Sequence, residues 1–264
     1  MSQPTRTKII VISMEDAAER RNRFEARAIG ATVPWIFVRA HTALHPALTH
    51  SEEDAILAKG RPLRRGEIGC YSSHYAAWLD LQADDADQYI VLEDDVIVDW
   101  AFIAKIVDLE FHRMGIDYLR LYYKSPVRAS LVRPQFIEQN RSIVELNGPA
   151  FGTQGYVITK AGARKLLDHC RVVRRPVDDE MDRSWVHGLR NLAIFPFPIL
   201  EEATPSGIGE ARYESYPLPE NIRLRRAVTQ RLDRWRRDAV GVVRRFQRLG
   251  TRLRSRLHTG NASR

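Results

Sequence analysis

The sequence predicts an α/β protein in which a mostly parallel sheet is flanked by helices, followed by an arginine-rich helical tail. Short runs of branched apolar residues, such as 9–12 and 89–92, are typical of strands covered on both faces of a sheet. Longer segments rich in Glu, Arg and Ala separate these runs, and this alternation indicates a parallel sheet. The chain of 264 residues is long enough for one large domain, placed at 1–220, with an appendage at 221–264.

Capping and stop signals define the elements of the first part of the chain. Ser13 can cap the first helix, and Gly30 stops it. The third buried strand ends directly at three consecutive acids. The expected elements are a strand at 8–13, a helix at 15–28, a strand at 35–38, a short helix from Thr49 or Ser51 to 59, a helix at 72–82 and a strand at 89–92.

The second part of the chain continues the alternation. Thr159 can cap one helix, and Pro176 opens another. The expected elements are a helix at 101–114, a strand at 118–123, a hairpin or excursion over 125–147, a strand at 152–158, helices at 160–169 and 177–187, and a strand at 193–200. Two prolines place that last strand at a sheet edge. In sheets of this kind, ligands bind at the carboxyl ends of the strands.

The charge is divided unevenly along the chain. Residues 221–264 contain 14 arginines, no lysine and two acids, a net charge of +12, whereas residues 1–220 carry 27 bases and 31 acids, a net charge of −4. No apolar run approaches the roughly 20 residues of a membrane-spanning helix. The polar residues 1–8 do not resemble a secretory signal, so Cys70 and Cys170 are expected to be reduced thiols of a cytoplasmic protein.

The acidic triplet Glu93-Asp94-Asp95 is the strongest local signal for chemistry. Adjacent carboxylates repel one another, and a strand end tolerates them where they face water or share a cation. Mg²⁺ and Mn²⁺ prefer such oxygens, with substrate phosphates completing the coordination shell. The alternative is a solvated turn that caps the next helix. The sequence has neither a P-loop motif nor a dinucleotide fingerprint.

A second signal runs from Leu63 to Trp78. Its glycines, Gly66 and Gly69, flank an expected turn into a helix, where backbone N–H groups can meet an anion. His74 and Trp78 are four residues apart and share a helix face. Taken alone, the segment is better explained as a packed helix with a hydrogen-bonded histidine.

Three blocks taken together resemble glycosyltransferase family 25, the group of lipopolysaccharide-biosynthesis and collagen galactosyltransferases. The blocks are Val11-Ile12-Ser13 with Glu19-Arg20-Arg21, then Gly66-Glu67-Ile68-Gly69-Cys70 with Ser73-His74 and Trp78, and Leu92-Glu93-Asp94-Asp95-Val96. Weaker similarity continues through 155–159, 176–178, 196–198 and 206–208, so the resemblance covers about residues 8–209.

The resemblance implies a GT-A type fold, with a Rossmann-like mixed sheet, and inverting transfer of a hexose, often galactose, from a UDP-sugar. The acceptor would be a saccharide or lipid-linked saccharide of lipopolysaccharide or another envelope glycan. Asp95 would bind Mn²⁺ or Mg²⁺, and Glu93 would contact the ribose or the metal shell. The other candidate substrate-binding residues are Ser13, Glu67, Ser73, His74 and Asp94, the last with no task beyond its charge.

Inverting transfer also needs a base for the acceptor hydroxyl, and a carboxylate with a raised pKa suits this role. Asp178 and Asp179 are the candidates, because they match the family's Pro-Val-Asp segment and have other acids nearby. The alternative is that these acids only begin the helix after Pro176, where negative charge is favoured.

The basic tail has one apolar stripe at helical spacing. Its members are Leu224, Val228, Leu232, Trp235, Ala239, Val242, Phe246, Leu249, Leu253 and Leu257. Such a helix is typical of an interfacial membrane element, here on the inner face of the cytoplasmic membrane. The alternatives are packing on the acidic body or on a coiled-coil partner. No nucleic-acid module is recognisable in the body, so nucleic acid is not an expected partner.

Two other functions remain open at this point. One is another metal-dependent nucleotide or phosphoryl enzyme that uses the same triplet, although the phosphate motifs are missing. The other is a catalytically silent, membrane-associated scaffold of the same fold, against which the intact triplet argues.

Overall fold

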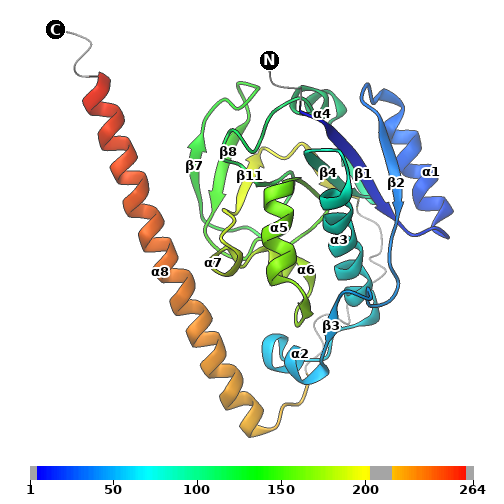
Figure 1. The fold of residues 1–264 in the computed structure, drawn as a ribbon, viewed down its shortest axis with the longest axis vertical. Helices are drawn as coiled ribbons and strands as arrows, with labels where there is room; N and C mark the ends of the chain where they lie inside the picture. Colours follow the sequence, from blue (N-terminus) through cyan, green and yellow to red (C-terminus); the bar gives the residue numbers. More distant parts are fainter. Residues whose placement is uncertain (1–4, 203–215, 260–264) are drawn as a thin grey trace. The chain divides into compact units, whose positions relative to one another are not determined.

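A computed structural model describes residues 5–202 and 216–259 of the chain (Figure 1). It divides into two compact units, Met1–Pro217 and Leu218–Arg264, whereas the sequence placed the boundary after residue 220. The two units are described separately.

The first unit alternates strands and helices as expected. In its first part the elements are β1 (Thr7–Ser13), α1 (Ala18–Arg27), a 3₁₀ turn (Ala28–Gly30), β2 (Trp35–Arg39), β3 (Thr49–His50), α2 (Glu52–Lys59), α3 (Arg65–Ala83), β4 (Gln88–Glu93), β5 (Val96–Val98) and α4 (Trp100–Ile106). The later elements are β6 (Tyr118–Arg120), β7 (Ala129–Arg133), β8 (Ser142–Leu146), β9 (Gly155–Thr159), α5 (Lys160–His169), β10 (Val172–Val173), α6 (Val177–Met181), α7 (Ser184–His187), β11 (Leu192–Phe195) and β12 (Ile199–Glu201).

Eight strands form one mixed sheet in the order β2-β1-β4-β9-β6-β11-β8-β7. The β1–β2, β1–β4 and β6–β11 pairs are parallel, but β9 is antiparallel to both β4 and β6, and β8 to both β11 and β7. The expectation of a mostly parallel sheet was therefore wrong, because β9 is as fully buried as a parallel strand and its apolar run carries no information on direction. The mixed sheet flanked by helices agrees with the fold that the resemblance implies.

The carboxyl ends of β1, β2, β4, β6 and β11 meet at one edge of this sheet, since these strands all run the same way. The acidic triplet follows β4 at this edge, which confirms the position expected for it. Two small sheets, β3 with β10 and β5 with β12, were not predicted from the sequence, because strands of two or three residues carry too little pattern.

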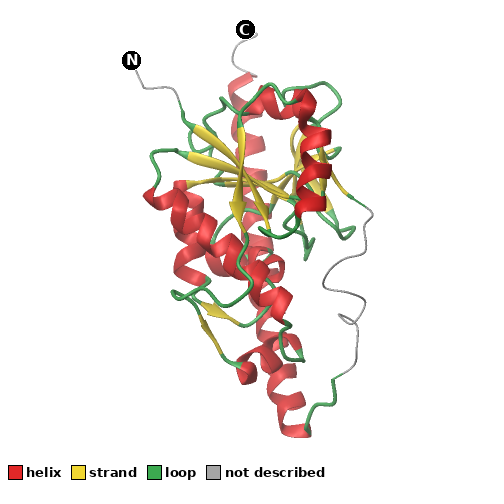
Figure 2. Cartoon of the chain, turned by 90° about the vertical axis from the view of Figure 1, so that its right-hand side faces the viewer, coloured by secondary structure: helices red, strands yellow, loops and turns green. Residues whose placement is uncertain are grey.

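Helices lie on both sides of the sheet (Figure 2). Apolar side chains pack on both faces of the sheet. Ile10 and Val91 pack with residues of α3 and α5, whereas Ile9 and Leu92 pack with residues of α1 and α4. Successive residues of a strand point to opposite faces, so both faces of β1 and β4 are apolar. The prediction of strands covered on both faces is confirmed.

Helix α3 begins at Arg65, seven residues earlier than expected, so both glycines lie inside it. Glu67 satisfies its first turn by accepting a hydrogen bond from the backbone N–H of Arg64 at 3.0 Å. At Gly69, an added Cβ would lie 2.6 Å from the carbonyl oxygen of His41. The glycine therefore permits close packing of the helix against the segment after β2, and it does not form a turn.

The other differences lie at element ends. Residues 193–200 form two strands, and β11 is internal to the sheet, between β6 and β8, so the expected edge strand was wrong. Helix α4 ends at Ile106, and 177–187 forms two short helices. The hairpin within 125–147 and the Thr159 cap, which accepts from the N–H of Gly162, are confirmed.

The second unit contains α8 (Glu220–Thr259), which confirms the helical tail. Gly241 lies within this helix without ending it. None of the helices that the structure describes is both long and apolar enough to cross a membrane.

Candidate active site

Glu93 is the last residue of β4, and its carboxylate is held by two neighbours. Oε1 accepts a hydrogen bond from the hydroxyl of Thr153 at 2.5 Å and lies 3.3 Å from Nε2 of His74. The hydroxyl of Tyr156 lies 2.9 Å from Nδ1 of His74 and so fixes the buried imidazole. The same hydroxyl accepts a hydrogen bond from Nε1 of Trp78 at 3.0 Å. The block from His74 to Trp78 is thus both a packed, hydrogen-bonded helix segment and part of the site.

Burial acts to raise the pKa of Glu93, but His74 and Thr153 outweigh it and hold the pKa below its usual value. The carboxylate is therefore ionised at neutral pH. Oε2 takes part in neither of the two contacts described for Oε1.

Asp94 is buried and points to the end of β1. Its Oδ2 accepts from the hydroxyl of Ser13 at 2.7 Å, and its Oδ1 accepts from the guanidinium of Arg20. The Nε of Arg21 donates to the same Ser13 hydroxyl at 3.0 Å. Asp94 therefore joins the ends of two neighbouring strands to α1, a task that the sequence did not suggest. Arg20 and Arg21 belong to the first family block, but their role was missed.

Asp95 has the least satisfied carboxylate of the three. Its Oδ2 lies 3.2 Å from Arg20, whereas its Oδ1 is buried and, among the described residues, has no hydrogen-bond partner. Burial, then the charge of Glu93, raises the pKa of Asp95 to about 7, with Arg20 opposing. A buried oxygen without a partner is costly unless something absent from the structure binds it.

The triplet residues fit a hard divalent cation. Arg20 is the one guanidinium that pairs with both Asp94 and Asp95 among the described ion pairs, and Glu93 contacts His74 and Thr153 instead. The Oδ1 of Asp95, which has no hydrogen-bond partner among the described residues, is a suitable oxygen ligand. A cation bound there would also offset the repulsion by Glu93, which adds to the effect of burial in raising the pKa of Asp95. Asp95 is thus the residue best placed to hold Mn²⁺ or Mg²⁺. Glu93 could be a further ligand through its carboxylate, which lies beside His74.

Glu67 and Ser73 support the loops around the site. The carboxylate of Glu67 is buried and forms a bidentate ion pair with Arg61, at 2.7 and 2.8 Å. The hydroxyl of Ser73 accepts from the backbone N–H of His41 at 2.8 Å and donates to the carbonyl of Gly69 at 2.8 Å. Both side chains fix the surroundings of α3, and direct contact with a substrate stays a prediction.

A strained loop before β9 carries Thr153 to Glu93. Phe151 and Gly152 have φ values of 55° and 87°, a conformation that a non-glycine residue adopts only when its surroundings impose it. The buried Asp182 accepts from the N–H of Phe151 at 2.7 Å, and Arg120 donates to the carbonyl of Gly152 at 2.6 Å. Arg120 and Asp182 also pair at 2.9 Å. The sequence did not predict this pair, because Arg120 and Asp182 are 62 residues apart and neither belongs to a recognisable motif.

The same loop reaches the candidate bases. Gly152 donates its backbone N–H to Asp178 at 3.3 Å. Asp179 forms an ion pair with Lys59 at 2.6 Å. Burial raises the pKa of Asp179 despite the opposing charge of Lys59, and Asp178 adds to the rise. The structure thus brings Asp178 to the loop that also contacts Glu93, and Asp179 to α2.

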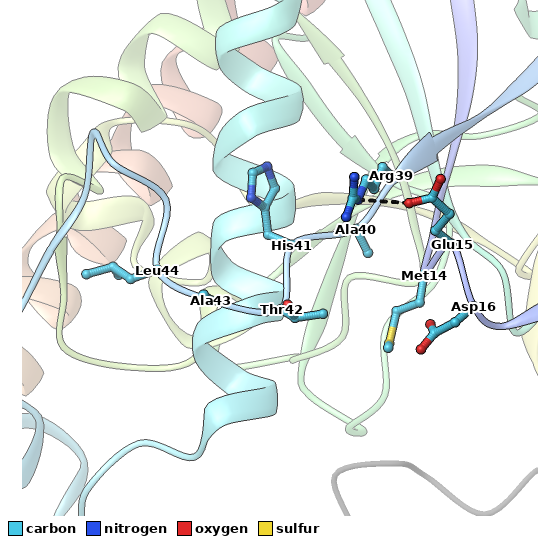
Figure 3. Close-up of a pocket in the computed structure, with 9 residues that line it drawn as sticks. All are labelled: Met14, Glu15, Asp16, Arg39, Ala40, His41, Thr42, Ala43 and Leu44. Carbon is cyan, nitrogen blue, oxygen red and sulfur yellow. Dashed lines mark ion pairs between the residues drawn. The ribbon is translucent and has the colours of Figure 1, made fainter.

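A cavity of about 630 Å³ lies at the carboxyl ends of β1 and β2 (Figure 3). Residues 14–16 after β1 and 39–44 after β2 line it, and Arg39 pairs with Glu15 at 3.3 Å. Burial, then the charge of His45, lowers the pKa of His41. Ser13 links this cavity to the triplet through Asp94. The sequence had not singled out the segment 39–44.

Comparison with known proteins supports the resemblance. The sequence profile of glycosyltransferase family 25 (LPS biosynthesis protein) matches residues 6–181. Procollagen galactosyltransferase 2 of Homo sapiens is 33% identical over 109 residues, 40% of this chain and 17% of that protein. Inactive glycosyltransferase 25 family member 3 of Homo sapiens is 28% identical over 187 residues, 65% of this chain and 30% of that protein. The chain therefore spans less than a third of the length of these curated relatives.

Among solved structures, galactosyltransferase LgtC in complex with donor and acceptor sugar analogs matches with a TM-score of 0.34 and 11% identity, over 83% of this chain and 99% of that chain. The profile match contains all three blocks on which the resemblance rests. The weaker pieces at 196–198 and 206–208 lie beyond it, and 206–208 also lies outside the described residues.

Proposed function

Since this chain belongs to glycosyltransferase family 25, we propose that it transfers a hexose, with galactose the first candidate, from a UDP-sugar to a saccharide acceptor with inversion. The single observation that carries the proposal is the Oδ1 of Asp95, which is buried directly after β4 and has no hydrogen-bond partner among the described residues. Ligands of open α/β sheets bind at the carboxyl ends of the strands.

The cavity after β1 and β2 is suited to the nucleoside part of the donor. Its volume of about 630 Å³ lies within the usual range for small-molecule sites, about 300–1,000 Å³. Residues 39–44 offer backbone groups, and Arg39 offers a cation to a ligand that carries phosphates. The Ser13–Asp94 contact places the triplet next to this cavity, where the diphosphate of such a donor would lie.

Asp95, assisted by Glu93, would hold Mn²⁺ or Mg²⁺ at the diphosphate. A cation held there supplies charge stabilisation as UDP leaves. Arg20 keeps Asp94 and Asp95 together, and His74 and Thr153 keep Glu93 ionised and oriented. These contacts hold the carboxylates at the end of β4 in position before any ligand arrives, so little reorganisation is needed on binding.

Asp179 is the preferred base for the acceptor hydroxyl, with Asp178 the alternative. A raised pKa brings Asp179 nearer to the range in which a carboxylate accepts a proton efficiently at neutral pH. The acceptor proposed is a saccharide or lipid-linked saccharide of lipopolysaccharide or another envelope glycan, in keeping with the description of the family.

A screen of UDP-sugars for UDP release tests the proposal. We expect release with at least one UDP-hexose and a suitable saccharide acceptor, dependent on added Mn²⁺ or Mg²⁺ and abolished by a chelator. Binding of UDP-sugars without turnover would instead favour the catalytically silent scaffold. One relative of this chain, glycosyltransferase 25 family member 3 of Homo sapiens, is named inactive. Release of other nucleotides alone would favour a different nucleotide enzyme.

The tail is proposed to hold the protein on an anionic membrane surface at the cytoplasmic face. Residues 221–264 carry a net charge of +12, and their sequence has one apolar stripe at helical spacing. Each basic residue near such a surface contributes about 1 kcal/mol, so several arginines acting together give stable attachment.

Liposome flotation measures this attachment. We expect the full chain to float with vesicles containing anionic lipid and to lose flotation at high salt, because the attraction is screened. Removal of residues 218–264 should abolish it. In the full chain, glutamine substitutions at Arg231, Arg234, Arg236 and Arg237 should weaken it while preserving helix length. Unchanged flotation of the truncated protein would disprove the membrane role.

A further inference from the structure

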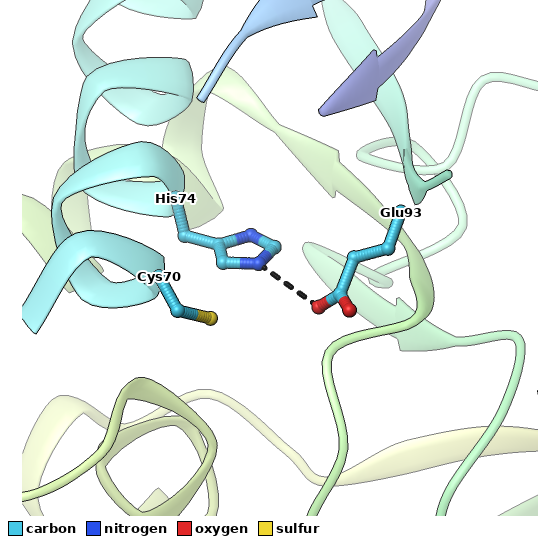
Figure 4. Close-up of side chains that lie close together, drawn as sticks. All are labelled: Cys70, His74 and Glu93. Carbon is cyan, nitrogen blue, oxygen red and sulfur yellow. Dashed lines mark hydrogen bonds and ion pairs between the residues drawn. The ribbon is translucent and has the colours of Figure 1, made fainter. Parts of the chain in front are cut away.

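Cys70 and His74 form a cluster of potential metal ligands with Glu93, the first residue of the acidic triplet (Figure 4). The sulfur, a ring nitrogen and a carboxylate oxygen all lie within 4.8 Å of one another. Cys70 and His74 are one turn apart on α3, so they share a helix face, which meets the end of β4. The 3.3 Å between Nε2 of His74 and Oε1 of Glu93 equals the spacing, about 3.3 Å, of two ligands around tetrahedral Zn²⁺.

The surroundings already hold these ligands in place. Tyr156 contacts Nδ1 of His74 at 2.9 Å and so fixes the ring with Nε2 toward Glu93, while Trp78 anchors the Tyr156 hydroxyl. Thr153 orients the carboxylate of Glu93. Metal-binding histidines generally have such a partner on the second ring nitrogen, and loss of that partner weakens metal binding.

The ligand types select a different cation from that of Asp95. A thiolate, an imidazole and a carboxylate suit Zn²⁺, whereas Mg²⁺ and Mn²⁺ prefer oxygen ligands alone. Three protein ligands also leave the fourth position of Zn²⁺ open. We propose that Cys70, His74 and Glu93 form a second site, specific for Zn²⁺, whose occupation withdraws Glu93 from the donor site. On binding, the thiol proton of Cys70 passes to solvent as its sulfur bonds to the metal.

The proposed antagonism between Zn²⁺ and the donor rests on the proposed function, because it assumes that Glu93 assists donor binding. The Zn²⁺ site itself does not depend on the proposed function. A Glu93 carboxylate that ligates Zn²⁺ together with His74 and Cys70 is no longer available to assist the cation held by Asp95. Zn²⁺ should therefore lower the affinity for UDP in the presence of Mn²⁺, an effect that Mg²⁺ should not produce.

Cobalt binding to the full, metal-free chain tests the site without any nucleotide. Co²⁺ replaces Zn²⁺ in tetrahedral sites and gives a thiolate charge-transfer absorption. We expect one Co²⁺ per chain with this absorption, displaced by Zn²⁺. Cys70→Ser should abolish the absorption, while Cys170→Ala, at the other, buried cysteine, should keep it. Tyr156→Phe should weaken Zn²⁺ binding by about 10- to 100-fold.

Absence of the thiolate absorption in the unmodified chain, or its persistence in Cys70→Ser, would overturn the site. Calorimetry of UDP binding tests the second part. Zn²⁺ should weaken UDP binding in the unmodified chain but not in Cys70→Ser, and equal weakening in both would overturn the antagonism. A chain that binds Co²⁺ through Cys70 but no UDP would disprove the proposed function and leave the Zn²⁺ site standing.

Discussion

Asp95→Asn should lower UDP-sugar turnover by about 10³-fold, because it removes the charge that would hold the cation at the diphosphate. The buried Oδ1 of Asp95 has no hydrogen-bond partner among the described residues, so this oxygen is available for the cation, while Oδ2 lies near Arg20. Asparagine keeps the shape of the side chain and an oxygen for Arg20. Steady-state rates across a range of Mn²⁺ concentrations measure the effect.

The same substitution should stabilise the protein in the presence of a chelator. The pKa of Asp95 is raised from 3.8 to about 7, so the folded state binds a proton more tightly than the unfolded state does. Ionisation of Asp95 therefore costs stability progressively as the pH rises from about 4 to about 7, and the full cost is present above that. Asparagine never ionises, so the variant should melt at a higher temperature at pH 8 and nearly equally at pH 4.

Asp85→Asn is a matched control, because Asp85 is an exposed acid before β4, far along the strand from the triplet, and pairs with Arg6 at 2.5 Å. It should change neither the rate nor the pH dependence of melting. Mn²⁺ should raise the melting temperature of the unmodified chain and of the control, but not of Asp95→Asn. Full turnover by Asp95→Asn would show that the metal site lies elsewhere.

The position of the acidic triplet in the sheet could be predicted from the sequence, but not the different contacts that its three residues make. A buried strand followed by three acids is a local pattern, and it correctly placed the triplet at the carboxyl edge. The directions of the three carboxylates depend on partners 19 to 81 residues away, such as His74 for Glu93 and Ser13 for Asp94. No local pattern encodes such contacts, so the anchoring role of Asp94 was not foreseen.

The fold shows the same limit. Apolar runs identified β1 and β4, because burial on both faces leaves a local signature, but they could not reveal that β9 runs against its neighbours. The Arg120–Asp182 pair was invisible for a related reason: its members are 62 residues apart and meet only after the sheet has formed. Buried ion pairs of this kind are expensive to break, and here the pair fixes the loop that joins both halves of the site.

Asp179→Asn should lower kcat by about 10²- to 10⁴-fold, the usual contribution of a general base, with a smaller effect on KM. Burial raises the pKa of Asp179, and Lys59 at 2.6 Å limits the rise. The rate should therefore fall as the pH drops through this pKa, and Asp179→Asn should lose that acidic limb. The pH profile of kcat/KM for the two proteins is the measurement.

Lys59→Met tests whether the acidic limb of the pH profile belongs to Asp179, because it should shift that limb in a known direction. Without the positive charge, the ionised form of Asp179 loses its ion pair, so its pKa rises further and the acidic limb should move to higher pH. A general loss of structure would lower the rate at every pH without moving the limb. Asp178→Asn is the neighbouring comparison: a larger loss there than in Asp179→Asn would transfer the role of base to Asp178. If neither substitution lowers kcat, these acids serve only to begin α6, where the helix N-terminus favours negative charge.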